Sequence, residues 1–163
     1  VEDFLKIPEP LIQKEFSRVM SLKDGLKKMS KSELSDLSRI NLTDTKDQII
    51  NKIKKAKTDT LPMPSSIQEL KERHEVKNLI GIYSNLIETT TEKTIASFSG
   101  KNFSDFKNDL SQVLVEKIEP ISNEIKKLKS NKEYLSQILA EGSKKANEIA
   151  SEKIKKIHEI VGF

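Results

Sequence analysis

The stretch Val76-Lys77-Asn78-Leu79-Ile80-Gly81-Ile82-Tyr83-Ser84-Asn85-Leu86-Ile87 decides the fold class. Its apolar residues recur at intervals of three and four, which places them on one face of an α-helix. The same spacing recurs downstream and predicts four further helical segments, over residues 95–98, 103–128, 134–139 and 146–160. The sequence therefore predicts a mainly α protein.

Three residues predict where these helices end or bend. Gly142 and Gly162 each follow a periodic stretch, and glycine in that position supplies the left-handed cap that ends a helix. Pro120 lies within the longest stretch and predicts a kink, because proline removes a backbone donor. We expect residues 76–163 to form a bundle of about five helices, held together by shared apolar faces.

The residues before this region have a different character. A short strand or an extended segment is predicted over Ser17–Leu22, and a strand over Ser38–Leu42, where polar and apolar residues alternate. The polar run Thr43-Asp44-Thr45 offers a cap for a helix that carries Ile49 and Ile53 on one side. Prolines and serines then interrupt the pattern over residues 58–66. The predicted division is residues 1–60, a linker at 61–75, and the helical region 76–163.

The composition excludes several classes of function. Of 163 residues, 35% are apolar and 33% are charged, and the formal net charge is +4, which fits one modest core and solvated helix faces with local basic patches. The absence of cysteine excludes a disulfide framework, a thiolate metal site and a cysteine nucleophile. No segment fits a transmembrane helix or a secretory signal. Because the chain begins with Val1 in what resembles the middle of a domain, we expect it to be a fragment.

Most catalytic templates do not fit this chain. Its five glycines are too scattered for a dinucleotide-binding or phosphate-loop motif. His74 and His158 have no second histidine at ligand spacing, so we expect both to be solvated and predict no metal site. The segment Lys27–Ser32 remains, in which Lys28 and Lys31 can converge on a polyanion beside serine hydroxyls and backbone amides. A solvated lysine loop without a function is the alternative.

The order of residues in this segment decides between these two interpretations. Lys28-Met29-Ser30-Lys31-Ser32 reproduces the KMSKS motif of class I aminoacyl-tRNA synthetases without a substitution. The chain resembles the C-terminal half of the bacterial tryptophanyl-tRNA synthetase family along nearly its whole length. The matching segments, in the family's order, are residues 7–12, 18–22, 40–44, 54–59, 78–83, 142–146 and 160–163.

The resemblance implies a fold and a reaction. The implied fold is the C-terminal end of a Rossmann-type α/β catalytic domain, followed by an all-α anticodon-binding bundle. The family activates L-tryptophan with ATP to give tryptophanyl-adenylate and pyrophosphate, and then transfers the aminoacyl group to tRNA(Trp). Mg²⁺ on the ATP phosphates, a homodimer of the full-length enzyme and the bacterial cytoplasm are implied as well, with the mitochondrial matrix as an alternative location.

The resemblance also implies roles for individual residues. Lys28 and Lys31 would be catalytic and hold the ATP phosphates and the departing pyrophosphate, while Met29 would cover the nucleotide. Ser30 and Ser32 would shape the loop and donate hydrogen bonds to ATP. Val19 falls where the family contacts ATP, through its backbone in our interpretation. The alternative is that Val19 and the neighbouring Met20 pack under the loop.

Two features limit the resemblance. The family's HIGH-like motif and its tryptophan pocket are not in this sequence, so we expect the fragment alone to be inactive. The helical region has several lysines that could face tRNA, but they are nearly balanced by acidic residues, and no individual anticodon-reading residue is assigned. These lysines are Lys126, Lys127, Lys129, Lys144, Lys145, Lys153, Lys155 and Lys156. The alternatives are a tyrosyl-tRNA synthetase and a non-catalytic helical module that binds RNA or protein.

Overall fold

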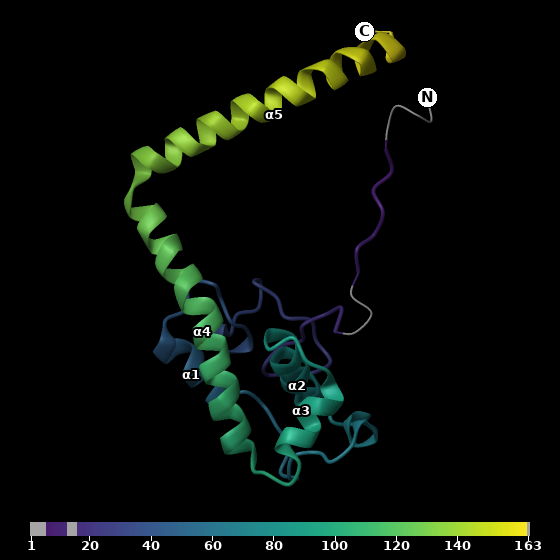
Figure 1. Ribbon diagram of the computed structural model, residues 1–163, viewed down its shortest axis with the longest axis vertical. Helices are drawn as coiled ribbons and strands as arrows, with labels where there is room; N and C mark the ends of the chain where they lie inside the picture. Colours follow the sequence, from purple (N-terminus) through teal and green to yellow (C-terminus); the bar gives the residue numbers. More distant parts are fainter. Residues whose placement is uncertain (1–5, 13–15, 163) are drawn as a thin grey trace. The chain divides into compact units, whose positions relative to one another are not determined.

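The computed structural model describes residues 6–12 and 16–162, and these residues are mainly helical (Figure 1). The elements in chain order are the short 3-10 helix η1 (Asp36–Ser38), α1 (Lys46–Lys54), the 3-10 helix η2 (Ile67–Leu70), α2 (His74–Leu86), α3 (Thr91–Phe98), α4 (Phe103–Ser130) and α5 (Lys132–Val161). The predicted mainly α fold class is thereby confirmed. The matching segment 7–12 is described here as irregular chain, and Phe163 of the C-terminal match lies outside the described residues.

The predicted strand over Ser38–Leu42 is wrong, and of the two alternatives for Ser17–Leu22 the strand is wrong, because neither segment forms a strand in the described structure. Met20 and Lys28 form a single isolated antiparallel bridge. The backbone amide of Asn41 donates to the carboxylate of Asp44, at 2.8 Å, where a strand would extend a ladder. Polar side chains thus compete for the backbone groups that regular pairing would need.

Packing divides the chain into two compact units, residues 1–119 and 120–163. The first unit has one core, to which α1, α2, α3 and the first part of α4 all contribute. Its largest fully buried apolar side chains are Leu22, Ile49, Ile53, Val76, Leu79, Ile80, Ile95, Phe106 and Leu110. The ring of Phe98 contacts both Tyr83 and Phe106, at centroid distances of 5.3 and 5.0 Å. Three helices are therefore joined through aromatic contacts.

The start of α1 follows the predicted capping chemistry. Thr45 is the N-cap, and its side chain accepts a hydrogen bond from the backbone amide of Gln48. The Gln48 side chain accepts from the Thr45 amide in return, at 2.8 Å, which completes a capping box. The helix begins at a fixed residue and presents Ile49 and Ile53 to the core.

The second unit contains the end of α4 and all of α5. Because α5 runs unbroken past Gly142, the predicted helix end there is wrong, and residues 76–162 contain four α-helices rather than about five. One exposed glycine costs a helix about 1 kcal/mol, which strong helix formers on either side can offset. Gly162 does end α5, with a φ of 83° and its amide bonded to the His158 carbonyl, as predicted.

The apolar residues of α5 are exposed in the described structure. None of the described residues of this helix is buried, and Ile149 is 76% exposed. The bundle held by shared apolar faces stays a prediction for this helix. Pro120 lies inside α4, at the boundary between the two units, and the kink at that position stays a prediction.

Candidate functional site

The segment that carries the lysine motif is fixed at its first end by short backbone contacts. The Ser21 amide donates to the Lys27 carbonyl at 2.8 Å, and the Met29 amide donates to the Val19 carbonyl at 3.0 Å. Between these pairs the chain turns at Gly25, where a Cβ atom would lie 2.5 Å from the backbone nitrogen of Glu75. Glycine is needed there because the turn rests directly on the start of α2.

Asn78 of α2 ties this first end to the helical core. Its side-chain oxygen accepts from the Met20 amide at 2.9 Å, and its side-chain nitrogen donates to the Met20 carbonyl at 2.8 Å. Asn78 is only 3% exposed, so these two bonds satisfy a buried amide that would otherwise destabilise the core. The segment before the lysine motif is thus held in an extended conformation without belonging to a sheet.

The tip of the loop is exposed. Lys28, Lys31 and Ser32 lie on the surface, whereas Met29 and Ser30 are half-buried. The Ser30 hydroxyl oxygen accepts a hydrogen bond from the Ser32 amide at 3.2 Å, which is a local turn of the kind that serine favours. Both lysine side chains are therefore on the surface, Lys31 at the middle of the serine turn and Lys28 two residues before it.

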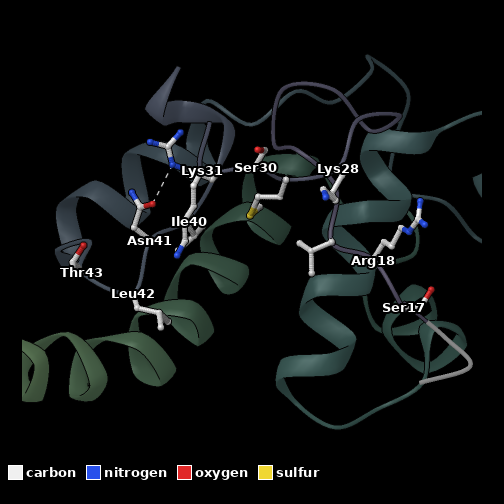
Figure 2. Close-up of a pocket in the computed structure, with 12 residues that line it drawn as sticks. Ser17, Arg18, Lys28, Ser30, Lys31, Ile40, Asn41, Leu42 and Thr43 are labelled. Carbon is white, nitrogen blue, oxygen red and sulfur yellow. Dashed lines mark hydrogen bonds between the residues drawn. The ribbon is translucent and has the colours of Figure 1, made fainter. Parts of the chain in front are cut away.

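A cavity of about 670 Å³ lies beside this loop. Five of the six predicted site residues line it, namely Val19, Lys28, Met29, Ser30 and Lys31. Ser32 is not among the lining residues. Figure 2 shows the other wall, where Ile40, Asn41, Leu42 and Thr43 follow one another along the chain. The structure therefore brings the predicted residues together with a second segment.

The cavity combines positive charge with apolar surface. Its ionisable lining residues are Arg18, Lys28, Lys31 and Arg39, and no carboxylate lines it among the residues that the structure describes. Val19 and Leu42, which are 40% and 55% exposed, offer apolar surface in the same space. Cationic side chains attract a polyanion, and exposed apolar surface suits the face of a planar ring. The arrangement fits a ligand that has both parts.

Sequence reasoning missed the second wall of the cavity. The alternation in Ser38–Leu42 was interpreted as a strand, although its polar residues Arg39 and Asn41 line the cavity instead. The sequence did contain a signal, because a segment rich in hydrogen-bonding side chains follows the motif closely. Whether that segment lines the same cavity depends on the direction that the chain takes after Ser32, and hydrophobic periodicity does not encode this direction.

Behind this wall lies a buried group of charges. The Lys52 ammonium of α1 is 2.7 Å from a carboxylate oxygen of Asp44 and 2.7 Å from one of Asp36. Lys52 and Asp44 are 2% and 4% exposed. The hydrogen bond from Lys52 is the main cause that lowers the pKa of Asp36, and a bond from Asn41 adds to it. Both bonds favour the ionised form of Asp36.

The remaining candidates show no comparable arrangement. No group of three or more possible metal ligands of the His, Cys, Asp or Glu type occurs among residues 6–12 and 16–162. His74 is half-buried at the first residue of α2, and His158 is exposed near the end of α5. The lysines proposed to face tRNA lie at the end of α4 and along α5, and all are exposed. No helix among the described residues is long and apolar enough to cross a membrane.

Known proteins resemble the chain in sequence and in fold. The model of the family described as tRNA synthetases class I (W and Y) matches residues 1–119. The tryptophan–tRNA ligase of Rickettsia conorii is 46% identical over 162 residues, which is 99% of this chain and 48% of the ligase. That of Caulobacter vibrioides is 45% identical over 160 residues, covering 98% of this chain and 46% of its own length.

The similarity extends to solved structures. The crystal structure of tryptophanyl-tRNA synthetase from Mycoplasma pneumoniae has a TM-score of 0.82 and 25% identity, covering 99% of this chain and 49% of that one. The enzyme from Campylobacter jejuni, complexed with ADP and tryptophan, shares the fold with a TM-score of 0.67 at 22% identity. The chain spans about half the length of the curated relatives that it matches. It belongs to the tRNA synthetases class I (W and Y) family.

Proposed function

We propose that this chain is the C-terminal half of a tryptophan–tRNA ligase, which joins L-tryptophan to tRNA(Trp) at the expense of ATP. One observation carries the proposal: four of the five residues of the intact Lys28–Ser32 motif line a cationic cavity, in a chain whose curated relatives bear that name at 42–46% identity. The complete enzyme would first form tryptophanyl-adenylate and pyrophosphate. It would then transfer the aminoacyl group to the tRNA.

In this proposal the cavity holds ATP. Lys28 and Lys31 bind the phosphates and stabilise the negative charge that collects on the departing pyrophosphate. Met29 covers the nucleotide, Val19 contacts it through the backbone, and Ser30 and Ser32 shape the loop. Because no described lining residue is a carboxylate, Mg²⁺ that arrives with ATP would keep phosphate and water ligands.

The helical part has a separate role in the proposal. Residues 1–60 would complete the catalytic domain, 61–75 would link the domains, and 76–163 would approach the anticodon of tRNA through exposed lysines. Binding through such charges should weaken as the salt concentration rises. The complete ligase would act as a homodimer in the bacterial cytoplasm or, in the alternative, in the mitochondrial matrix.

The test measures tryptophan-dependent exchange of pyrophosphate into ATP in the complete ligase. Lys31→Ala should slow exchange about a hundredfold, since it removes a preorganised charge, and leave the KM for tryptophan nearly unchanged. Lys27→Ala is the matched control, because Lys27 pairs loosely with Asp24 at 3.8 Å and does not line the cavity. Equal losses in the two variants, or equal effects on exchange and on tryptophan binding, would contradict the proposal.

Tyrosine is the competing amino acid, because the matched family model covers both the W and the Y enzymes. The names of the relatives at 42–46% identity support tryptophan. Replacing tryptophan with tyrosine in the exchange assay should reduce the rate to background. Exchange that depends on tyrosine alone would instead assign the tyrosyl enzyme.

A further inference from the structure

The loop tip is held between two anchors, and the second of them involves a side chain that the motif does not include. On the first side, the Met29 amide is bonded to Val19. On the other side, an Nη atom of Arg39 donates to the Glu33 carbonyl at 2.8 Å. Glu33 lies only two residues after Lys31, so this contact limits the positions that Lys31 can reach.

Arg39 lines the cavity, yet its nitrogen atoms are occupied by protein partners. The Nε atom donates to the Asn41 side chain at 3.1 Å, and the second Nη atom lies 3.0 Å from an Asp36 oxygen. Its side chain is 17% exposed. Because its planar guanidinium is bonded to three protein groups, Arg39 fixes the positions of those groups, whereas a guanidinium without protein partners would have its donors available for a ligand. Arg39 is therefore placed to act on the loop.

The partners of Arg39 are fixed in turn from below. Lys52 bridges Asp36 and Asp44, while the Asn41 side chain donates to both carboxylates, at 3.0 and 3.2 Å. Lys52 and Asp44 are buried and must keep their partners because an unpaired buried charge is costly, whereas Asp36 is exposed and is held by its bonds to Lys52, Asn41 and Arg39. The contacts run from α1 through Asp36 to Arg39 and the loop.

We propose that Arg39 is a positioning residue for the adenylate-forming reaction, and that it holds Lys31 toward the cavity by anchoring the Glu33 carbonyl to the buried charges around Lys52. The inference rests on the proposed function for its catalytic part. A loop restrained at both ends reaches the productive geometry with a smaller loss of conformational entropy. The tip remains able to open and close between the anchors.

The first test needs no ATP and uses the complete ligase. Hydrogen exchange of the amides from Ser30 to Glu33 is compared in the original chain, Arg39→Ala and Arg73→Ala. Arg73 is a matched control, because it also joins a carboxylate, Asp59, to a backbone carbonyl, that of Pro62, and its side chain is 10% exposed. We expect exchange about tenfold faster in Arg39→Ala alone. Unchanged exchange in that variant overturns the inference.

The second test uses pyrophosphate exchange by the complete ligase. Arg39→Ala should lower kcat about tenfold and leave the KM for tryptophan unchanged, and Arg39→Lys should lose less because it keeps one donor and the charge. The double variant Arg39→Ala with Lys31→Ala should be no slower than Lys31→Ala alone, since Arg39 acts through Lys31. Multiplicative losses in the double variant overturn the positioning role.

The two proposals fail in different ways. If Lys31→Ala leaves pyrophosphate exchange intact, the ATP role of the loop is overturned, and the catalytic part of the inference with it, even where Arg39→Ala loosens the loop. If Lys31→Ala is slow but Arg39→Ala neither loosens the loop nor lowers kcat, the ATP role stands and the inference is overturned. The Arg39→Lys variant keeps the test informative should Arg39→Ala fail to fold.

Discussion

The segment from Val19 to Thr43 and the helix α5 differ in two properties, regular secondary structure and attachment through tertiary contacts. The segment contains one short 3-10 helix and no strand, yet Asn78 and Lys52 fix it to the core from two sides. Helix α5 is 30 residues of regular backbone and buries none of its described residues. Regular local structure and attachment to the rest of a protein are thus separate properties. In this chain the candidate site depends on attachment.

The largest expected effect compares two helical isoleucines, one from each compact unit, that differ strongly in burial. Ile49 of α1 is fully buried, and Ile149 of α5 is 76% exposed. Ile49→Ala should reduce the free energy of unfolding of the first unit by about 3 kcal/mol, because it removes buried apolar surface and leaves a cavity. Ile149→Ala should change it by less than about 0.5 kcal/mol. Urea unfolding measures both.

A similar loss from the two substitutions would contradict this comparison. It would mean that α5 is packed in solution against a surface that the described chain leaves uncovered. Alanine is a better helix former than isoleucine by a few tenths of a kcal/mol at both positions. The helical contribution therefore cancels between the variants, and the remaining difference reports burial.

The spacing of apolar residues predicted a helix correctly where that spacing fitted only a helix. The stretch 76–87 gave α2, and Thr45 and Gly162 proved to be caps as predicted. Gly142 was misread because a glycine ends a helix only if its backbone turns left-handed, and neighbouring helix formers prevented that turn. Whether α5 packs against anything depends on the surfaces available to it, which its own spacing does not encode.

The candidate site was predicted only in its motif. Lys28–Ser32 is a contiguous sequence, so its chemistry is legible without a structure. The wall of Arg39 and Asn41 and the anchors at Lys52 and Asn78 are separated from the motif by up to about fifty residues. Asparagine and lysine on a helix are ordinarily solvated, so only tertiary contacts distinguish these two as anchors.

The next effect concerns the anchor of the first end of the loop. Asn78→Ala removes the two hydrogen bonds to Met20 and a longer one to the Ser21 carbonyl, and it leaves the Met20 amide and carbonyl without their partner, which should cost about 2 kcal/mol of stability. Asn85→Ala is the matched control on the same helix, because Asn85 is exposed and donates only to the Gly81 carbonyl. Asn85→Ala should lower the free energy of unfolding by less than about 0.5 kcal/mol.

The readout that separates an anchor from general destabilisation is local. Hydrogen exchange at Met20 and Met29 should accelerate in Asn78→Ala at denaturant concentrations well below the unfolding transition. Faster exchange confined to α2, with Met20 still protected, would mean that the hydrogen bond from the Met29 amide to the Val19 carbonyl holds the segment without Asn78.

The smallest effect depends on pH and concerns the ion pair between Asp59 and Arg73, at 2.7 Å, which joins the segment after α1 to the start of α2. The hydrogen bond from Arg73 is the main cause that lowers the pKa of Asp59 below its ordinary value. A carboxylate whose folded pKa is lowered contributes stability above its unfolded pKa, about 3.9, and loses that contribution as the pH falls through the folded pKa. Because Asp59 is partly exposed, solvent screening limits the contribution to about 1 kcal/mol or less.

Asp59→Asn should therefore lower the free energy of unfolding between pH 5 and 7, and the difference from the original chain should shrink below about pH 4. Urea unfolding at pH 7, 5, 4 and 3 measures this difference, with the same substitution in an Arg73→Gln background as the control. In that background the difference should be small and independent of pH, since the cation that lowers the pKa of Asp59 is absent. A difference that grows toward pH 3 would mean that folding favours the protonated carboxyl and would contradict a lowered pKa. A difference that still shrinks with falling pH in the Arg73→Gln background would mean that groups other than Arg73 hold the carboxylate.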